Sequence, residues 1–194
     1  MASLKCMLEI PVIAKAPLRP EGSLRFALRA ATTDLHAAVD ARFSGDFATD
    51  TSAYADFLRS LARAVLPLER LLEAAGIGRI LTDWPERRRS AFLIRDLRIL
   101  GCDVPAGVAV PRAGNGAWLL GAAYVLEGSR LGGKVLLRRV MENPDPVARE
   151  ATHYLRHGMA TDLWPSFLGQ LEGSSAAIDD AVAGARAAFK MFAA

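Results

Sequence analysis

The chain is poor in cysteine, and its two cysteines do not suit a structural or metal-binding role. Cys6 and Cys102 are the only ones among 194 residues, which excludes a disulfide framework. Neither belongs to a CxxC pair or stands near a histidine at metal-ligand spacing. We therefore expect reduced thiols, as in the cytoplasm, with Cys102 packed in a loop.

Long hydrophobic runs are also missing. The apolar stretch over residues 7–18 is interrupted by Glu9, Lys15 and two prolines. No other segment approaches the ~20 uncharged apolar residues that a membrane-spanning helix needs. A signal peptide is therefore not expected. We predict a protein that is neither exported nor embedded in a membrane and that has a cytoplasmic location.

A strong excess of one charge is lacking as well. The 24 Lys and Arg residues exceed the 21 Asp and Glu residues by 3, and the arginines alternate with acids along the chain. Although the pI is near 9.1, this pattern does not favour a nucleic-acid partner. With 52% hydrophobic residues, the chain is long enough to bury one full-sized core.

Strand patterning is absent, and helical spacing of apolar residues dominates after residue 22. Residues 1–22 contain three prolines and no periodicity, which predicts an irregular arm before one all-α domain over residues 23–194. Pro67 should kink the second helix, and residues 102–112 should form a loop. The helices are expected at about 23–39, 54–72, 85–100, 115–142, 146–157, 162–171 and 174–192.

One histidine stands out inside the first expected helix. His36 lies off the leucine stripe, on the face that also carries Arg25 and Arg29. Arg29 is two turns earlier, about 10.5 Å along the helix axis. An imidazole and a guanidinium on one face would match a flat metal macrocycle with peripheral carboxylates. A surface histidine with an unrelated arginine is the simpler alternative, because a single histidine is weak evidence.

The expected helix over 115–142 carries an unusual number of glycines. Each interior glycine costs roughly 1 kcal/mol relative to alanine, so something should compensate. Gly121, Gly128 and Gly132 form one stripe without side chains, and Arg139 falls on the same stripe. Either a planar ligand or another helix lies against it. A local break at Gly132-Gly133 is compatible with both alternatives.

Two separated motifs resemble the bacterial heme oxygenases, particularly the type associated with bacteriophytochromes. The first is Leu28-Arg29-Ala30-Ala31-Thr32 with Leu35-His36 and Asp40, and the second is Tyr124-Val125-Leu126-Glu127-Gly128-Ser129-Arg130-Leu131-Gly132-Gly133. Shorter similarities between and after them extend the resemblance over nearly the whole chain from about Ser23.

This resemblance implies an all-α bundle that holds heme between a proximal helix and a kinked distal helix. His36 matches the proximal iron ligand, and Arg29 matches a basic residue near the heme propionates. Gly128 and Gly132 match the distal glycines. The implied reaction uses O₂ and external electrons to cleave heme, which is both cofactor and substrate, to biliverdin, CO and ferrous iron.

The chain departs from the family pattern at two positions. Many relatives place an Asp directly after the first distal glycine to organise water, whereas this chain has Ser129. Proton delivery then needs another arrangement, in which Ser129, Arg130 or backbone carbonyls hold the waters. Several relatives carry a second basic residue where this chain has Thr33, so we expect Arg29, together with Arg139, to hold the propionates. The position of ring cleavage stays open.

The electrons must come from a separate donor, because no GxGxxG fingerprint for a flavin or nicotinamide follows a strand. The resemblance implies a ferredoxin, a flavodoxin or a reductase. The biliverdin is expected either to reach an acceptor such as a bacteriophytochrome or to be a by-product of iron acquisition.

Three alternatives remain at the level of sequence. A heme carrier of the same fold without turnover is kept open by Ser129. A hydrolase of small heterocycles would need a catalytic cysteine in a central cavity, where we do not expect Cys102. A helical interaction module would bind no ligand. We expect His153 and His157 to be a solvated pair, because no acidic or cysteine partner accompanies them in a recognisable metal motif. We expect Arg87–Arg89 to form an exposed helix face.

Overall fold

The computed structural model describes residues 23–42 and 45–194, and within these residues it contains helices and no strand. The predicted all-α fold is confirmed. The predicted N-terminal arm lies outside the described residues. The elements are α1 (Leu24–Ala31), α2 (Thr33–Arg42), α3 (Thr51–Ala74), η1 (Ile77–Arg79), α4 (Trp84–Arg87), α5 (Ser90–Ile99), α6 (Gly116–Met141), α7 (Pro146–Glu150), α8 (His153–Arg156), α9 (Leu163–Gly173) and α10 (Ile178–Ala193).

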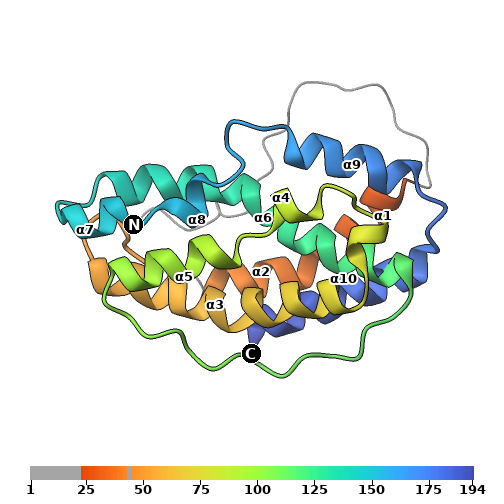
Figure 1. Ribbon diagram of the computed structural model, residues 1–194, viewed down its shortest axis with the longest axis horizontal. Helices are drawn as coiled ribbons and strands as arrows, with labels where there is room; N and C mark the ends of the chain where they lie inside the picture. The colour runs from red at the N-terminus through yellow and green to blue at the C-terminus, as the bar shows by residue number, and fades with distance from the viewer. Residues whose placement is uncertain (1–22, 43–44) are drawn as a thin grey trace.

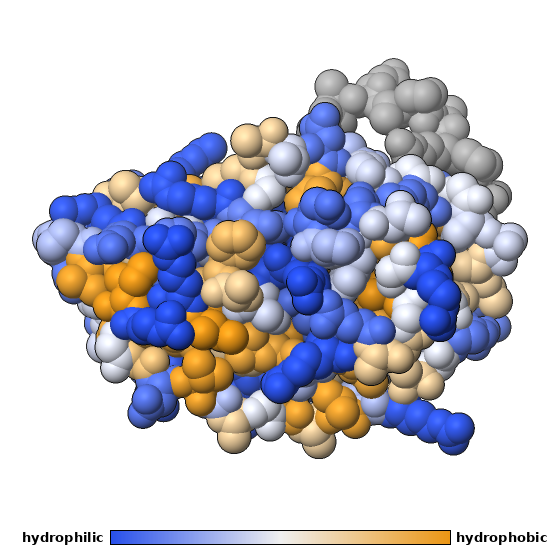
Figure 2. Space-filling model, viewed as in Figure 1, coloured by the Kyte–Doolittle hydropathy of each residue, from blue (hydrophilic) through white to orange (hydrophobic). Residues whose placement is uncertain are grey.

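The long helix α6 runs the length of the molecule, with α3 and α10 on one side and α9 on the other (Figure 1). Its first half packs closely on α10, which also contacts α1, α2 and α3. Hydrophobic residues reach the face shown in Figure 2 in separate groups among hydrophilic ones. None of the described helices is both long enough and apolar enough to cross a bilayer.

The first expected helix is in fact two helices that meet at Thr32. The Thr32 backbone adopts φ −120° and ψ 7°, and its N–H bonds to the Arg29 carbonyl, one residue short of α-helical spacing. The hydroxyls of Thr32 and Thr33 compete for helix carbonyls by bonding to Leu28 O and Arg29 O. Because the break is one residue long, α2 still begins close to α1, and Arg29 remains near His36.

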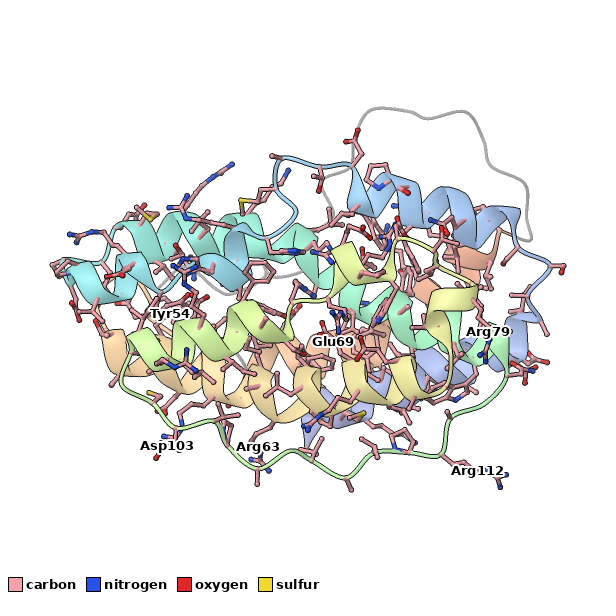
Figure 3. The ribbon with its side chains drawn as sticks, in the orientation of Figure 1. Tyr54, Arg63, Glu69, Arg79, Asp103 and Arg112 are labelled. Atoms are coloured by element: carbon pink, nitrogen blue, oxygen red, sulfur yellow. The ribbon has the colours of Figure 1, made fainter. Side chains whose placement is uncertain are left out.

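Pro67 lies inside α3, which is continuous from Thr51 to Ala74. A proline has no N–H for the carbonyl four residues earlier, and that carbonyl, on Arg63, accepts instead from Val108 N at 2.9 Å. The loop between α5 and α6 is thereby fixed along the outer side of α3, where Arg63 is labelled in Figure 3. The missing helical bond is thus used to place a loop.

The third expected helix is divided into α4 and α5 by an extended residue, Arg88. Glu69 of α3 supports the start of α5, because its carboxylate accepts from the backbone N–H groups of Arg89 at 2.8 Å and Ser90 at 3.0 Å. Figure 3 labels Glu69 between these helices. This capping bond requires the chain to turn inward at Arg89, which is incompatible with one exposed helix.

Candidate active site

His36 is half-buried on α2 and packs edge-to-face on Phe189 of α10, with ring centroids 4.4 Å apart. Its Nδ1 atom is buried and has no hydrogen-bond partner among the described residues. Buried polar atoms are nearly always paired, so an unpaired imidazole nitrogen needs an explanation. The alternative of a simple surface histidine does not fit this burial.

Burial, together with the smaller effect of the positive charge of Arg29, lowers the pKa of His36 from 6.5 to about 4. The imidazole is therefore neutral at physiological pH. A neutral imidazole has a nitrogen lone pair available, which is the form that binds a metal ion.

Asp40 has a matching unpaired atom one turn further along α2. Its Oδ1 is buried without a hydrogen-bond partner among the described residues, and burial raises the pKa of its carboxyl group. Residues four apart on a helix face the same side. One helix face therefore presents an unpaired imidazole nitrogen and an unpaired carboxylate oxygen on residues one turn apart.

A group of cations and aromatic rings lies where α1, α6 and α9 meet. The Arg25 guanidinium is 5.9 Å from the ring centre of Trp164, which is in turn 5.8 Å from the ring of Tyr124. Burial raises the pKa of Tyr124, while the charges of Arg25 and Arg29 act to lower it. Both arginines are therefore close to Tyr124. Two cations beside a hydroxyl group suit the binding of carboxylates.

Arg25 precedes Arg29 by one helical turn, which is the signal in the sequence that could have selected it as a second cation. Arg139 is in the last turn of α6 and follows Tyr124 by 15 residues. That separation is about 22 Å along a helix. The structure thus brings Arg25 and Arg29 together and leaves Arg139 away from them.

The glycine stripe of α6 divides into two parts. A Cβ atom on Gly121 would collide with the backbone carbonyl of Ala181 in α10, so this glycine serves helix packing. A Cβ on Gly128 would be 3.8 Å from the Trp164 ring, an ordinary contact. Gly132 is buried, and α6 remains helical through Gly133 without a break. Helix packing explains Gly121 but does not account for Gly128.

Ser129 is partly buried and already hydrogen-bonded. Its hydroxyl donates to Leu126 O at 2.7 Å and accepts from Nη2 of Arg89 at 2.7 Å. This arginine was expected on an exposed face, but its residue is only 3% exposed. The polar group next to Gly128 is therefore a serine hydroxyl that is held by a buried cation.

The expectation of an exposed face is also wrong for Arg87, whose side chain is fully buried. Its guanidinium pairs with Asp83 at 2.5 Å and with Glu127 at 2.7 Å, and Glu127 also pairs with Arg130 at 2.8 Å. Only Arg88 in this run is well exposed, in a pair with Glu73. A charge run in a sequence does not reveal acids that come from other helices.

His153 and His157 are not a solvated pair. His153 Nδ1 is 2.7 Å from Oδ1 of the buried Asp96. The same carboxylate caps α8 by accepting from the backbone N–H groups of His153 and Tyr154. The His157 ring packs on Phe92 at 4.4 Å and contacts Arg130. Among the described residues, no group of three or more His, Cys, Asp or Glu side chains could hold a metal ion.

Comparison with known proteins gives a consistent assignment. The sequence model of the heme oxygenase family matches residues 23–194. A heme oxygenase from Xanthomonas campestris pv. campestris (strain 8004) is 36% identical over 148 residues, which cover 74% of this chain and 88% of that protein. The crystal structure of the NO- and CO-bound heme oxygenase from Neisseria meningitidis has the same fold, with a TM-score of 0.70, 21% identity and 88% of each chain covered.

Heme oxygenases use heme as both cofactor and substrate and O₂ as co-substrate. The half-buried neutral histidine on α2, the glycine face of α6 and the arginine pair on α1 are compatible with that chemistry. On the family match and the related sequence, this chain belongs to the heme oxygenase family and is a heme oxygenase.

Proposed function

We propose that the chain cleaves heme to biliverdin, CO and ferrous iron, and that His36 would bind the heme iron. The observation that carries this proposal is the neutral, half-buried imidazole whose Nδ1 has no partner among the described residues. Bound heme supplies an iron centre that activates O₂ next to the ring that is to be oxidised. The following steps concern what the side chains of this protein contribute.

Asp40 orients the ligand in this proposal. A hydrogen bond from His36 Nδ1–H to Asp40 Oδ1 would pair both orphaned atoms and leave the lone pair of Nε2 for iron. Such a carboxylate partner fixes the tautomer of a ligating histidine and raises its basicity. The sequence alone did not assign a partner to the second ring nitrogen.

The propionate groups of heme would be held by Arg25 and Arg29, with Tyr124 as a further donor. Their closeness at the junction of α1, α6 and α9 supports this assignment. Arg139 stays a prediction, and its distance along α6 makes it the weaker one. Charged hydrogen bonds at one edge would set the rotation of the ring and hence the carbon that is cleaved.

Gly128 and Gly132 would let the backbone of α6 approach the other face of the ring, because neither carries a side chain that would fill the space needed for O₂. Ser129 would help to hold water that delivers protons, since its hydroxyl is fixed by Arg89 and Leu126 O. A heme carrier without turnover would also tolerate a serine at this position.

We further propose that electrons come from a separate ferredoxin, flavodoxin or reductase, that the protein works in the cytoplasm, and that the biliverdin passes to an acceptor such as a bacteriophytochrome. The two sequence motifs that resemble the bacteriophytochrome-associated type support the last point.

Turnover separates the enzyme from the carrier. Hemin-loaded protein supplied with ascorbate or a ferredoxin system in air should lose its Soret band and gain the absorption of biliverdin. His36→Ala should abolish product formation while leaving α2 intact, because alanine is the better helix former. A stable Soret band in the wild type would support the carrier, and unchanged turnover in His36→Ala would refute the ligand assignment.

A further inference from the structure

A small cavity lies on the side of α6 that carries Ser129 and Gly133, between α3, α6, α8 and the chain before α5. Its volume is about 20 Å³, and roughly 10–15 Å³ is enough for one water molecule. The polar lining consists of Arg89, Ser129, Arg130, Tyr154 and His157. No carboxylate lines it, so its polar character is mainly that of donors.

Arg89 is the dominant charge at this cavity. The residue is 3% exposed, and its guanidinium lies 4.5 Å from the ring centre of Tyr154. Only Nη2 is occupied, by Leu126 O at 2.6 Å and Ser129 Oγ at 2.7 Å. Nε and Nη1 make no hydrogen bond within the described part of the chain. The N–H groups on Nε and Nη1 of this buried cation, three in all, are therefore available to the cavity.

The nearby acids do not neutralise Arg89. Glu69 directs its carboxylate to the backbone N–H groups of Arg89 and Ser90 and to the Ser90 hydroxyl. Glu127 pairs with Arg87 and Arg130. Among the described residues, Arg89 forms no ion pair. A buried guanidinium without a directly bonded carboxylate favours an anion in the cavity that its free N–H groups can reach.

His157 adds a neutral donor. Its Nδ1 is 3.1 Å from Nη1 of Arg130, which can only donate, so the ring proton is on Nε2. Burial lowers the pKa of His157 to about 4, and Arg130 and Arg89 contribute in the same direction. The ring therefore presents one N–H group at neutral pH and does not compete with Arg89 as a cation.

We propose that this cavity binds one small monovalent anion, chloride under ordinary conditions, through the free N–H groups of Arg89. The cavity volume admits an ion slightly larger than water, the lining offers donors without a carboxylate, and the ion would neutralise the buried guanidinium. The cavity adjoins the proposed active site through Ser129, but the ion would be held by Arg89, and its binding can be measured without heme.

The test uses the full chain without heme in sodium chloride, sodium bromide and sodium gluconate at equal ionic strength. Gluconate is too large for the cavity. Above the dissociation constant, each tenfold increase in chloride should raise Tm by roughly 3–5 °C relative to gluconate. Arg89→Met should remove this difference. The neighbouring Arg88→Met is the matched control, since Arg88 is exposed and should leave the difference intact.

Diffraction from crystals of the wild type grown in bromide gives a readout that needs no variant, should Arg89→Met fail to fold. An anomalous bromide peak within hydrogen-bonding distance of Arg89 is the expected result. Equal Tm values in chloride and gluconate, together with water alone in the cavity at high bromide, would overturn the proposal.

Discussion

Two identical substitutions on α6 should have opposite effects on stability. In Gly121→Ala the new methyl group would overlap the backbone carbonyl of Ala181, and backbone atoms of a packed helix cannot move aside locally. Overpacking of this kind costs about 3 kcal/mol, from which a gain of about 1 kcal/mol in helix propensity is subtracted. The net loss of about 2 kcal/mol corresponds to a fall in Tm of roughly 4–8 °C.

Gly128→Ala should instead stabilise the protein without heme. The nearest atom to the new methyl group is in the Trp164 ring at 3.8 Å, so no clash opposes the propensity gain of about 1 kcal/mol. We expect Tm to rise by roughly 2–4 °C. The same variant should bind hemin less tightly, because the methyl group lies on the face that the proposal assigns to heme.

Thermal unfolding of both variants, followed by hemin titration of Gly128→Ala, makes this comparison. The division of the stripe into a packing part and a ligand part is refuted if Gly121→Ala is as stable as the wild type. It is equally refuted if Gly128→Ala is destabilised or binds hemin as the wild type does.

Three further predictions concern charge. Burial holds the folded-state pKa of His36 and His157 near 4, against 6.5 in the unfolded chain, so the free energy of unfolding should fall as pH decreases from about 6.5 to 4. The fall should be smaller in His36→Ala. Urea titrations at pH 7 and pH 5 measure it, and an equal fall in the wild type and His36→Ala would contradict the prediction. Arg87→Met should lower the free energy of unfolding by about 3 kcal/mol, since it leaves Glu127 with one partner in a buried site; a urea midpoint within error of the wild type would show that the pair contributes nothing. Arg25→Ala and Arg29→Ala should each weaken hemin binding roughly tenfold, because each loses a charged hydrogen bond. The control is Lys134→Ala, which removes an exposed charge and should leave hemin binding unchanged. Equal affinities in all three variants would place the propionates elsewhere.

The helical architecture could be predicted from the sequence because apolar spacing and capping residues act locally. Ser23 at the start of α1 and Asn115 at the start of α6 are examples whose side chains accept from backbone N–H groups of the first turn. The break at Thr32 was missed, and so was the loop that bonds to α3 at the carbonyl left free by Pro67. Both depend on which carbonyl finds a donor, and the donor for Arg63 O comes from a loop 45 residues later.

Sequence patterns could not predict which charged side chains near the site are buried. Arg87 and Arg89 stand in a run of three arginines that is typical of an exposed face. They are buried because Glu127 and Leu126 O come from α6 and Glu69 comes from α3. Local periodicity carries no information about such long-range partners. His36 and Arg29 were selected correctly as neighbours because they share one short segment of chain.

The most direct test of the account is the vibration of the bond between iron and histidine in the ferrous, heme-loaded protein, observed by resonance Raman spectroscopy. We predict an iron–histidine band in the wild type that is lost in His36→Ala and shifted to lower frequency in Asp40→Asn, where the imidazole loses its carboxylate partner. A band that persists unchanged in His36→Ala would contradict the assignment of His36 as the axial ligand.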